Sequence, residues 1–494
     1  MTAPALGRSA LPGILGGLAA VAGGLLLPPP APITEVGMAR LGLLAFAVIW
    51  WVATPLPAAF TTLAMLAAGV LSGALSLAGA FAHSNSWLLW FVIGTFGLGA
   101  ALDATGVNRR FALALLDVRW VRGHPVRFMT MFLISATLMS GVMANTVVAV
   151  VWLSLAVKIY ELLKIDHADP LVEANTLGIA WAANIGGLIT PVGNGTNAPT
   201  IGLVAAATGT TVTFLQWTAI GSGLALLLMA SAIALLWLAV PHGSGTLGGP
   251  HLSDHISAER RRLGPMPVAE RRALAWVGVA VALWFAPDAA RMLLSPDIAA
   301  IAQSRLHLTV PALLVPLGMC LTPVPDPKRR FVLTWEEWLR GVDWSLVLFI
   351  GGVMALGIAV GEEATGVPGY VRNTLEPLLG HLPETMFVLI LCGAVILVTS
   401  VISNMVTLAI FVPLGLTLSS SLGVGDPAAL GIILGMGTSL AHLLPSGTTT
   451  NAIVAGSGFL RVRTMVRHGA LLFLLHTLLL ALVGYPLAKL VLGH

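Results

Sequence analysis

Two stretches of this sequence decide its fold: Pro191-Val192-Gly193-Asn194-Gly195-Thr196-Asn197-Ala198 and Pro445-Ser446-Gly447-Thr448-Thr449-Thr450-Asn451-Ala452. Both follow the pattern Pro-x-Gly-x-x-Thr-Asn-Ala, and each interrupts a long apolar segment. Proline and glycine break a helix, and polar residues are costly in hydrocarbon. Interrupted apolar segments at corresponding places in the two halves of a membrane protein indicate the binding site of a secondary transporter.

The composition is that of a membrane protein. Of the 494 residues, 57% are hydrophobic and 9% are charged, whereas soluble domains carry about 25% charged residues. The net charge of +4 comes from basic loops and does not indicate nucleic acid. Cys320 and Cys392 lie in apolar segments and are interpreted as core residues, with no metal site or disulfide framework. We expect an all-α polytopic membrane protein of about 11 transmembrane helices plus two re-entrant hairpins.

The apolar blocks predict the order of helices along the chain. Transmembrane helices are expected at 11–27, 39–54, 57–76, 87–105, 214–240, 273–294, 308–323, 344–361 and 468–492, and interrupted helices at 171–207 and 428–460. Apolar blocks with polar centres cover 128–163 and 385–422, amphipathic stretches cover 106–127 and 364–382, and a polar loop covers 241–272. The first segment is interpreted as a membrane helix, because prolines replace the small-residue cleavage site of a secretory signal.

The same features recur in the same order in both halves. The segments Phe91-Val92-Ile93-Gly94 and Ala104-Thr105-Gly106-Val107 correspond to Phe349-Ile350-Gly351-Gly352 and Ala364-Thr365-Gly366-Val367. The segment Ser140-Gly141-Val142-Met143-Ala144-Asn145-Thr146 then corresponds to Thr399-Ser400-Val401-Ile402-Ser403-Asn404-Met405. The two Pro-x-Gly-x-x-Thr-Asn-Ala runs follow. Three matched features in one order predict an internal repeat.

The basic residues predict that the two repeats are inverted. Most of the 25 lysines and arginines face one side of the membrane if residues 106–127 are cytoplasmic. The equivalent stretch, 364–382, then lies outside, which satisfies the positive-inside rule. This orientation places the N-terminus in the cytoplasm and the C-terminus outside, in a membrane expected to be the bacterial inner membrane. Each polar-centred block must then enter and leave on one side, as a hairpin with Asn145 or Asn404 at its tip.

The hairpin tips and helix breaks bring together groups that bind cations and groups that bind anions. Carbonyl and amide oxygens suit a hard cation such as Na⁺, whereas free N–H groups at helix N-termini suit an anion. The expected cation sites are Ser140 and Asn145 with Gly193, and Thr399 and Asn404 with Gly447. A single asparagine in a membrane helix is most often a contact between helices, so the interpretation depends on the recurrence of the whole pattern.

Titratable residues are scarce inside the apolar segments. Asp103, Asp343 and Glu362 fall at predicted helix ends. His442 lies within an apolar run before Pro445, where a neutral, hydrogen-bonded histidine is the simplest interpretation and a proton or substrate contact the alternative. Proton-driven carriers normally need buried carboxylates or histidines, so this scarcity favours Na⁺ coupling or exchange.

These residues resemble the divalent anion:sodium symporter (DASS) family of the ion-transporter superfamily over nearly the whole chain. Its members carry two Ser-Asn-Thr motifs at hairpin tips, each paired with a Thr-Pro-Pro-Asn type run in a broken helix. The similar segments here are Ala144-Asn145-Thr146, Ser403-Asn404-Met405, Gly193-Asn194-Gly195-Thr196-Asn197 and Gly447-Thr448-Thr449-Thr450-Asn451. The lead-in Leu333-Thr334-Trp335-Glu336-Glu337 and Asp343-Trp344-Ser345 is also similar.

The resemblance implies a homodimer that works by an elevator motion. Scaffold helices would cover 1–105 and 273–363, the moving transport domain 128–240 and 383–494, arm helices 106–127 and 364–382, and a cytoplasmic loop 241–272. The implied substrates are C4-dicarboxylates, citrate or sulfate, bound between the hairpin tips with Na⁺ as the coupling ion.

The resemblance also implies the residues of each site. The implied substrate-binding residues are Asn145, Thr146, Asn194, Thr196, Asn404, Met405, Thr448 and Thr449. The implied Na⁺ sites are Ser140, Ala144, Asn145 and Gly193, and Thr399, Ile402, Asn404 and Gly447. This chain departs from the family pattern at Ala144, at Met405 and at both Pro-Pro pairs. Because Met405 replaces a threonine hydroxyl that would meet a substrate carboxylate, we expect an altered substrate preference with transport retained.

Other functions are weighed against this one. An anion exchanger without Na⁺ coupling would use the same tips and breaks. A cation/H⁺ antiporter or oxyanion permease of the same superfamily would need buried acidic residues in the broken helices, and none is expected there. A membrane-embedded enzyme would need clustered His, Asp or Glu, which the apolar segments lack, and a channel suits two interrupted repeats less well than alternating access. We therefore expect a transporter of a small anion, working within the lipid bilayer, and no enzyme.

Overall fold

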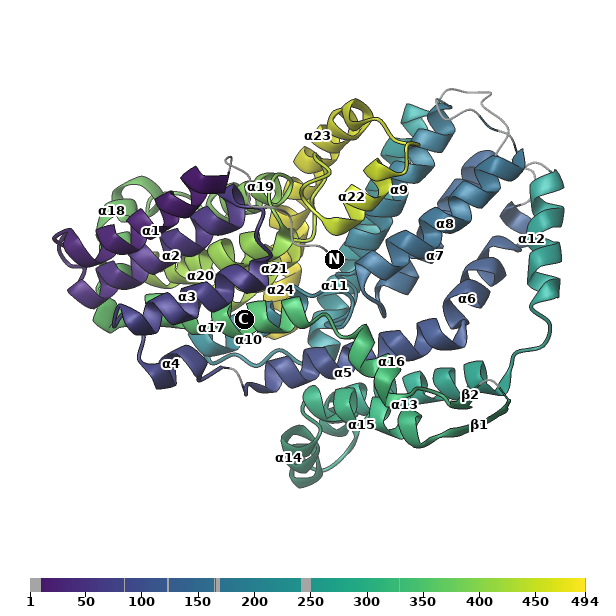
Figure 1. The fold of residues 1–494 in the computed structure, drawn as a ribbon, viewed down its shortest axis with the longest axis horizontal. Helices are drawn as coiled ribbons and strands as arrows, with labels where there is room; N and C mark the ends of the chain where they lie inside the picture. The colour runs from purple at the N-terminus through teal and green to yellow at the C-terminus, as the bar shows by residue number, and fades with distance from the viewer. Residues whose placement is uncertain are drawn as a thin grey trace.

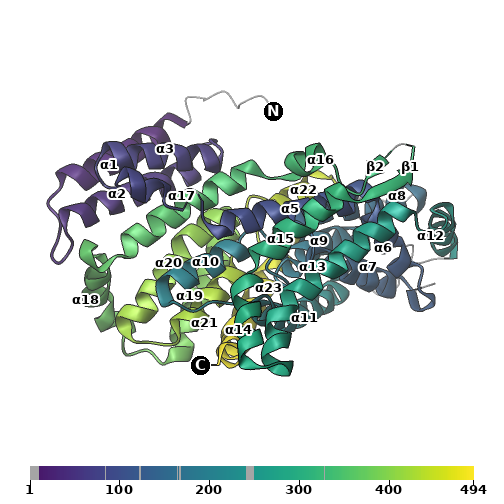
Figure 2. The same ribbon diagram turned by 90° about the horizontal axis from the view of Figure 1, so that it is seen from below.

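The computed structural model describes residues 10–83, 85–121, 124–163, 165, 169–240, 250–327 and 329–493. It is built almost entirely of helices, with one short antiparallel pair of strands, β1 (Pro323–Asp326) and β2 (Arg329–Phe331) (Figures 1 and 2). The predicted all-helical membrane fold is therefore confirmed. Eight helices are long and apolar enough to cross a membrane, or nine if the bent pair α14 (Pro296–Arg305) and α15 (Thr309–Leu321) counts as one span, within the described ranges.

The first part of the chain follows the predicted order. Its elements are α1 (Leu11–Leu26), α2 (Glu35–Ala53), α3 (Ala58–Leu71), α4 (Leu77–Phe81), α5 (Trp87–Thr105), α6 (Val107–Leu116) and the 3₁₀ turn η2 (Arg119–Val121). Gly106 separates α5 from α6 with a φ of 86°, a left-handed conformation that glycine adopts without strain. Gly366 does the same in the second half, with a φ of 70°, between the 3₁₀ turn η3 (Glu363–Thr365) and α18 (Val367–Leu379).

Both polar-centred blocks fold as helical hairpins, and both interrupted segments are broken. The first half contains α7 (Pro125–Ser140), α8 (Asn145–Leu163), α9 (Pro170–Gly186), α10 (Asn197–Thr208) and α11 (Phe214–Ala239). The second half contains α19 (Glu384–Thr399), α20 (Asn404–Leu422), α21 (Pro427–Gly437), α22 (Thr449–Gly456), α23 (Val462–Leu479), the π turn η4 (Leu480–Gly484) and α24 (Tyr485–Leu492). Asn145 and Asn404 each begin the second arm of a hairpin.

The middle of the chain differs from the sequence-based expectation in three places. Its helices are α12 (Pro250–Arg262), α13 (Val268–Leu293), α14 (Pro296–Arg305), α15 (Thr309–Leu321), α16 (Trp335–Gly341) and α17 (Trp344–Gly361). The predicted 241–272 loop contains α12, and α14 and the strand pair were not expected; residues 241–249 lie outside the described ranges. The α12 helix has too little apolar surface to show in a hydropathy pattern, and ion pairs such as Arg109–Glu259 and Arg260–Asp117 hold it against the segment that begins with α6.

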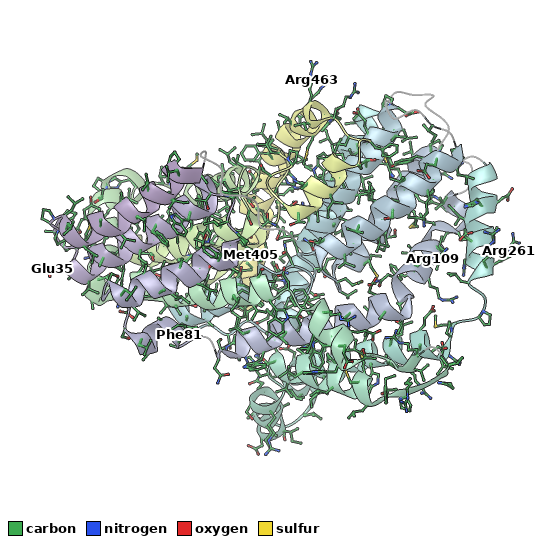
Figure 3. The ribbon with its side chains drawn as sticks, viewed as in Figure 1. Glu35, Phe81, Arg109, Arg261, Met405 and Arg463 are labelled. Carbon is green, nitrogen blue, oxygen red and sulfur yellow. The ribbon has the colours of Figure 1, made fainter. Side chains whose placement is uncertain are left out.

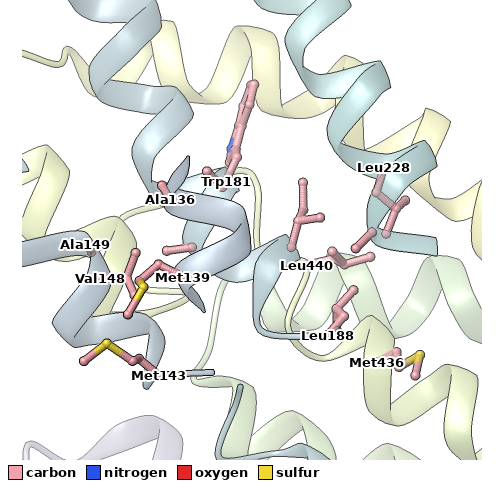
Figure 4. Packing of buried hydrophobic residues seen from close by; sticks show 14 of the residues in the cluster. Ala136, Met139, Met143, Val148, Ala149, Trp181, Leu188, Leu228, Met436 and Leu440 are labelled. Carbon is pink, nitrogen blue, oxygen red and sulfur yellow. The ribbon is translucent and has the colours of Figure 1, made fainter. Parts of the chain in front are cut away.

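The core surrounds the first arms of the two broken helices. All of α9 after Pro170 and all of α21 after Pro427 are buried. Figure 4 shows how this core is packed: Ala136 and Met139 of α7, Trp181 of α9, Leu228 of α11 and Met436 of α21 lie in one cluster of buried side chains. The breaks that follow these two arms are therefore held in the interior, away from lipid.

Candidate functional site

The two hairpin tips and the two helix breaks line one cavity of about 490 Å³. Among the predicted residues, those lining it are Ala144, Asn145, Thr146, Asn194, Asn404, Met405, Gly447, Thr448 and Thr449. Residues of α17 and its N-terminus, including Asp343 and Leu346, close the opposite wall. Figure 3 places Met405 near the centre of the projected molecule, whereas the charged Glu35, Arg261 and Arg463 lie at its edge.

The first candidate cation site lies where the first hairpin tip meets the first break. One end of the Asn145 side-chain amide lies 2.9 Å from Ser140 Oγ, 2.8 Å from the Gly193 carbonyl oxygen and 3.3 Å from the Ala183 carbonyl oxygen. Ser140 Oγ also donates to the Ala183 carbonyl, at 2.6 Å. A hydroxyl, two carbonyl groups and an amide therefore converge on one small volume.

The second candidate cation site repeats this arrangement in the other half. One end of the Asn404 amide lies 2.9 Å from Thr399 Oγ1, 2.9 Å from the Thr438 carbonyl oxygen and 3.2 Å from the Gly447 carbonyl oxygen. Thr399 Oγ1 donates to the Thr438 carbonyl, at 2.5 Å. Each group at one site thus has a counterpart of the same chemistry at the other.

The glycine in each break is required by close approach of the backbone. A Cβ atom at Gly193 would lie 2.7 Å from the carbonyl oxygens of both Gly187 and Ser140. A Cβ atom at Gly447 would lie 2.7 Å from the Thr399 carbonyl oxygen. Both distances are below van der Waals contact, so a larger residue would push the break away from the hairpin tip and separate the converging oxygens.

The groups at each site fit a hard cation. Carbonyl, hydroxyl and amide oxygens are the ligands such cations take in proteins. Two carbonyl oxygens and one hydroxyl surround the inner end of each asparagine amide. With the amide nitrogen turned inward, the nitrogen donates to these groups; with the amide oxygen turned inward, the oxygen joins a cluster of oxygens of the kind that binds a hard cation.

Two residues that the sequence analysis missed connect the halves. Asn184, near the end of α9, accepts from Thr450 Oγ1 at 2.7 Å and donates to Asn451 Oδ1 at 3.2 Å in the second break. Ser439, just after α21, accepts a hydrogen bond from the Asn194 amide in the first break and lies 3.3 Å from Thr196 Oγ1. Each broken helix therefore contacts the break of the other, and the two candidate cation sites share one hydrogen-bonded framework.

Some predicted residues lie outside the arrangement that the sequence suggested. Thr196 is fully buried beside Ser439 and does not line the 490 Å³ cavity. The Ala144 carbonyl accepts from Val147 N, at 3.0 Å, so it caps α8. At the inner ends of the two asparagine amides, the backbone carbonyls are those of Ala183 and Gly193 in the first half and of Thr438 and Gly447 in the second; Ala144 and Ile402, which were also expected, are not among them.

One buried carboxylate and two buried histidines have partners inside the fold. Glu173 is buried in the first broken helix, contrary to the expectation that no acidic residue is buried there. It accepts from Arg461 Nε at 2.6 Å and from Arg461 Nη2 at 2.8 Å, so its charge is compensated. His442 Nε2 lies 2.9 Å from His476 Nδ1, a partner that the sequence analysis missed. His476 Nε2 in turn lies 3.0 Å from Ser231 Oγ.

A second cavity of about 360 Å³ adjoins the first and leads toward the ends of α5 and α16. The two cavities share lining residues that include Phe96, Asn194 and Gly195. Asp103, Glu337 and Arg340 line the outer part. In the part of the chain that the structure describes, Arg340 is the one basic residue that lines the 360 Å³ cavity, and no lysine or arginine lines the 490 Å³ cavity.

The sequence is similar to those of known membrane transporters. The family model for the sodium:sulfate symporter transmembrane region matches residues 13–492. The sodium-dependent dicarboxylate transporter SdcS of Staphylococcus saprophyticus is 26% identical over 481 residues, covering 95% of this chain and 89% of that protein. The Na⁺/citrate cotransporter of Rattus norvegicus is 27% identical over 344 residues, covering 63% of this chain and 59% of that protein.

A solved structure shows the same fold. The crystal structure of the Alcanivorax borkumensis YdaH transporter superposes with a TM-score of 0.56 and 16% sequence identity, covering 99% of this chain and 98% of that chain. The long apolar helices, the transporter relatives and the family match together identify an integral membrane protein that is a transporter and not an enzyme. The chain belongs to the sodium:sulfate symporter family, the divalent anion:sodium symporter group that its motifs resemble.

Proposed function

We propose that this protein is a Na⁺-coupled secondary transporter of small divalent anions of the C4-dicarboxylate, citrate or sulfate type. The observation that carries the proposal is the pair of matched oxygen clusters at Asn145 and Asn404, one at each hairpin tip. Relatives named as a sodium-dependent dicarboxylate transporter and a Na⁺/citrate cotransporter support the same coupling ion and substrate class.

The cavity between the clusters supplies the anion site. Helices α8, α20 and α22 begin at its edge, at Asn145, Asn404 and Thr449. The free N–H groups and positive dipole ends of these helices favour an anion. Because the described lining contains no lysine or arginine, bound Na⁺ would supply most of the compensating positive charge. Binding of the anion would then depend on the ions, which is the basis of coupling.

Contacts between the two broken helices hold the candidate ion sites and the anion site in one unit, so the ions and the substrate would move together. Asn184 and Ser439 join the breaks of the two halves, and Arg461 joins the end of the second broken helix to Glu173 in the first. The contact between α17 and this group of helices is apolar, with Gly357 lying beside Pro413 and Leu203. A unit held together by these hydrogen bonds and this ion pair, with an apolar surface toward α17, supports an elevator motion. Inverted repeats, the two arm helices α6 and α18 and a homodimeric scaffold are also part of the proposal.

The test is uptake of labelled succinate, citrate or sulfate into proteoliposomes, with an inward gradient of Na⁺ or of choline. Na⁺-dependent uptake of one of these anions is the expected result. Uptake that needs a counter-anion inside the vesicles and ignores Na⁺ would identify an anion exchanger, the main alternative. Uptake driven by a pH gradient would favour the cation/H⁺ antiporter or oxyanion permease alternative.

A further inference from the structure

A groove lined mainly by apolar side chains lies between α7 and α11, with a volume of about 620 Å³. Its α7 wall contains Thr130, Ile134 and Leu138, at the four-residue spacing that puts side chains on one face of a helix. Its α11 wall extends from Ser222 to Trp237 at similar spacing. None of the described residues that line this groove also lines the 490 Å³ cavity, so the groove is separate from the candidate site.

The groove exists because both walls pack on α9 and the side chains between them are small. A Cβ atom at Gly178 of α9 would lie 2.6 Å from Leu133 Cδ1 of α7 and 3.0 Å from Leu236 Cδ1 of α11. Four of the α11 residues in the groove are small: Ser222, Ala225, Ala230 and Ala234. Met229 in the floor is buried, whereas Leu226 at the rim is 72% exposed. The groove is therefore open to the surroundings, which for a membrane-spanning helix such as α11 are lipid.

The length of the groove matches one leaflet of a bilayer. Residues 130–138 of α7 cover about 12 Å and residues 222–237 of α11 about 22 Å, at the rise of an α-helix. Half of the hydrocarbon core is about 15 Å thick, which lies between these lengths. At one end Trp237 Nε1 donates to Thr130 Oγ1 at 3.1 Å, and tryptophan is enriched where a membrane meets water. A single acyl chain that enters beside Trp237 would thus reach the middle of the membrane within the groove.

A positive charge lies one helical turn beyond this end. Arg127 precedes Thr130 by three residues, a spacing that places both on one face of α7. Its side chain is half-buried, with the guanidinium carbon 5.4 Å from the centre of the Trp120 ring, and it forms no ion pair within the described ranges. The free N–H groups at the start of α7, which begins at Pro125, add a positive dipole end. These charges are placed to meet an anionic group at the membrane surface.

The inner end of the groove contacts the first hairpin tip. Ile189, in the first break, lines this end. A Cβ atom at Gly141 of the tip would lie 3.1 Å from Ile189 Cβ, so the Ile189 side chain packs on the bare backbone there. The next residue, Thr190, donates from its Oγ1 to the Gly141 carbonyl at 2.5 Å. A molecule in the groove would therefore touch a residue that holds the first break against the tip.

We propose that this groove binds an anionic phospholipid, with one acyl chain between α7 and α11 and the phosphate at Arg127 and the N-terminus of α7. The apolar walls hold the chain, and Arg127 gives the preference for a negatively charged lipid. Through Ile189 the bound lipid stabilises the contact between the first tip and the first break. This lipid site goes beyond the proposed transport function and does not depend on it.

The test compares dioleoyl-phosphatidylglycerol, which is anionic, with dioleoyl-phosphatidylcholine, which has no net charge and the same acyl chains. Each lipid is titrated into the purified full-length protein in detergent, and thermal unfolding is followed, since a ligand of the folded state raises the unfolding temperature. Native mass spectrometry counts the lipids retained. Phosphatidylglycerol is expected to bind about fivefold more tightly, the effect of one arginine near the membrane surface, and this preference should shrink as salt is added.

Variants separate the chain from the head group. Ala230→Trp puts an indole into the groove from an exposed position and should lose the retained lipid of either kind. Arg127→Gln should bind phosphatidylcholine like the wild type and lose the preference for phosphatidylglycerol, and Arg127→Lys, which keeps the charge, should keep most of it. Ala470→Trp, at an exposed alanine of α23 outside the groove, is the matched control and should bind like the wild type.

Three results would overturn the inference. The first is equal binding of the two lipids by the wild type, a comparison that needs no variant and so holds even if a variant does not fold. The second is unchanged lipid retention in Ala230→Trp. The third is a smaller oligomer in Ala230→Trp, measured by light scattering, which would assign the groove to a contact between two copies of this chain.

Discussion

Replacing Asn145 by alanine removes the central group of the first candidate cation site. The inner end of its amide lies within 3.3 Å of three oxygens, and the side chain is 8% exposed. Ser140 Oγ keeps its hydrogen bond to the Ala183 carbonyl at 2.6 Å, so the tip is expected to fold. The Gly193 carbonyl, however, loses the group that lies 2.8 Å away.

The expected effect on Na⁺ follows from these contacts. An interaction with a charged partner contributes roughly 1.5–3 kcal/mol, which corresponds to about 10- to 100-fold weaker Na⁺ binding. In a coupled transporter the Na⁺ concentration for half-maximal uptake should rise by up to this range, and uptake at a Na⁺ concentration that half-saturates the wild type should be largely lost. Asn404→Ala should act in the same way at the second site, since its contacts match.

The assay is Na⁺-dependent uptake in proteoliposomes together with thermal unfolding in NaCl and in choline chloride at equal ionic strength. The unfolding temperature in choline reports stability alone, and its increase in Na⁺ reports ion binding. Asn373→Ala, at an exposed asparagine of α18, serves as the control and should behave like the wild type. Wild-type Na⁺ dependence in both Asn145→Ala and Asn404→Ala would refute the assignment of these clusters as cation sites.

Three further substitutions test other parts of the site. Gly447→Ala should weaken Na⁺ binding through a clash with the Thr399 carbonyl, at a cost of about 1–3 kcal/mol to stability; an unchanged unfolding temperature and Na⁺ response would show that the break can move freely. Asn184→Ala should weaken the dependence of one Na⁺ site on the other, seen as a lower Hill coefficient for Na⁺ in uptake, and an unaltered coefficient would show that this link does not couple the sites. Arg461→Gln should lower the unfolding temperature in detergent because it leaves Glu173 buried without a cationic partner, and adding Glu173→Gln to it should recover part of the loss; no recovery would show that the charge is not the cause.

The main elements of this fold were predictable because helices in a membrane need long apolar segments, which are easily recognised in the sequence. Hairpins, breaks and most helix ends fall within a few residues of the expected positions, and Gly106 and Gly366 lie at the turns between matched elements. Where sequence prediction failed, the physical signal was weak. The α12 helix is too polar to be detected from hydropathy. The 64° bend between α14 and α15 is not marked by a run of proline or glycine residues.

The composition of the candidate site was less predictable than its location. Asn145 and Asn404 were identifiable because asparagine recurs at one place in both halves. The carbonyls of Ala183 and Thr438 were not, since any residue carries a carbonyl and only the local backbone decides where it points. Likewise Glu173 and His476 look like unpaired polar residues in apolar segments until the fold brings Arg461 and His442 to them.

The sequence by itself determined that this chain crosses a membrane, carries matching motifs in its two halves and breaks its helices at two Gly-containing runs. Those properties depend on hydrophobicity and on the local conformations of proline and glycine. Both are determined by residues that are close together in the sequence. The tertiary structure alone decided that each broken helix reaches the break of the other half through Asn184 and Ser439, and that Met405 packs on Gly195. Such contacts join residues far apart in the chain, so they depend on how the helices pack and leave no local pattern.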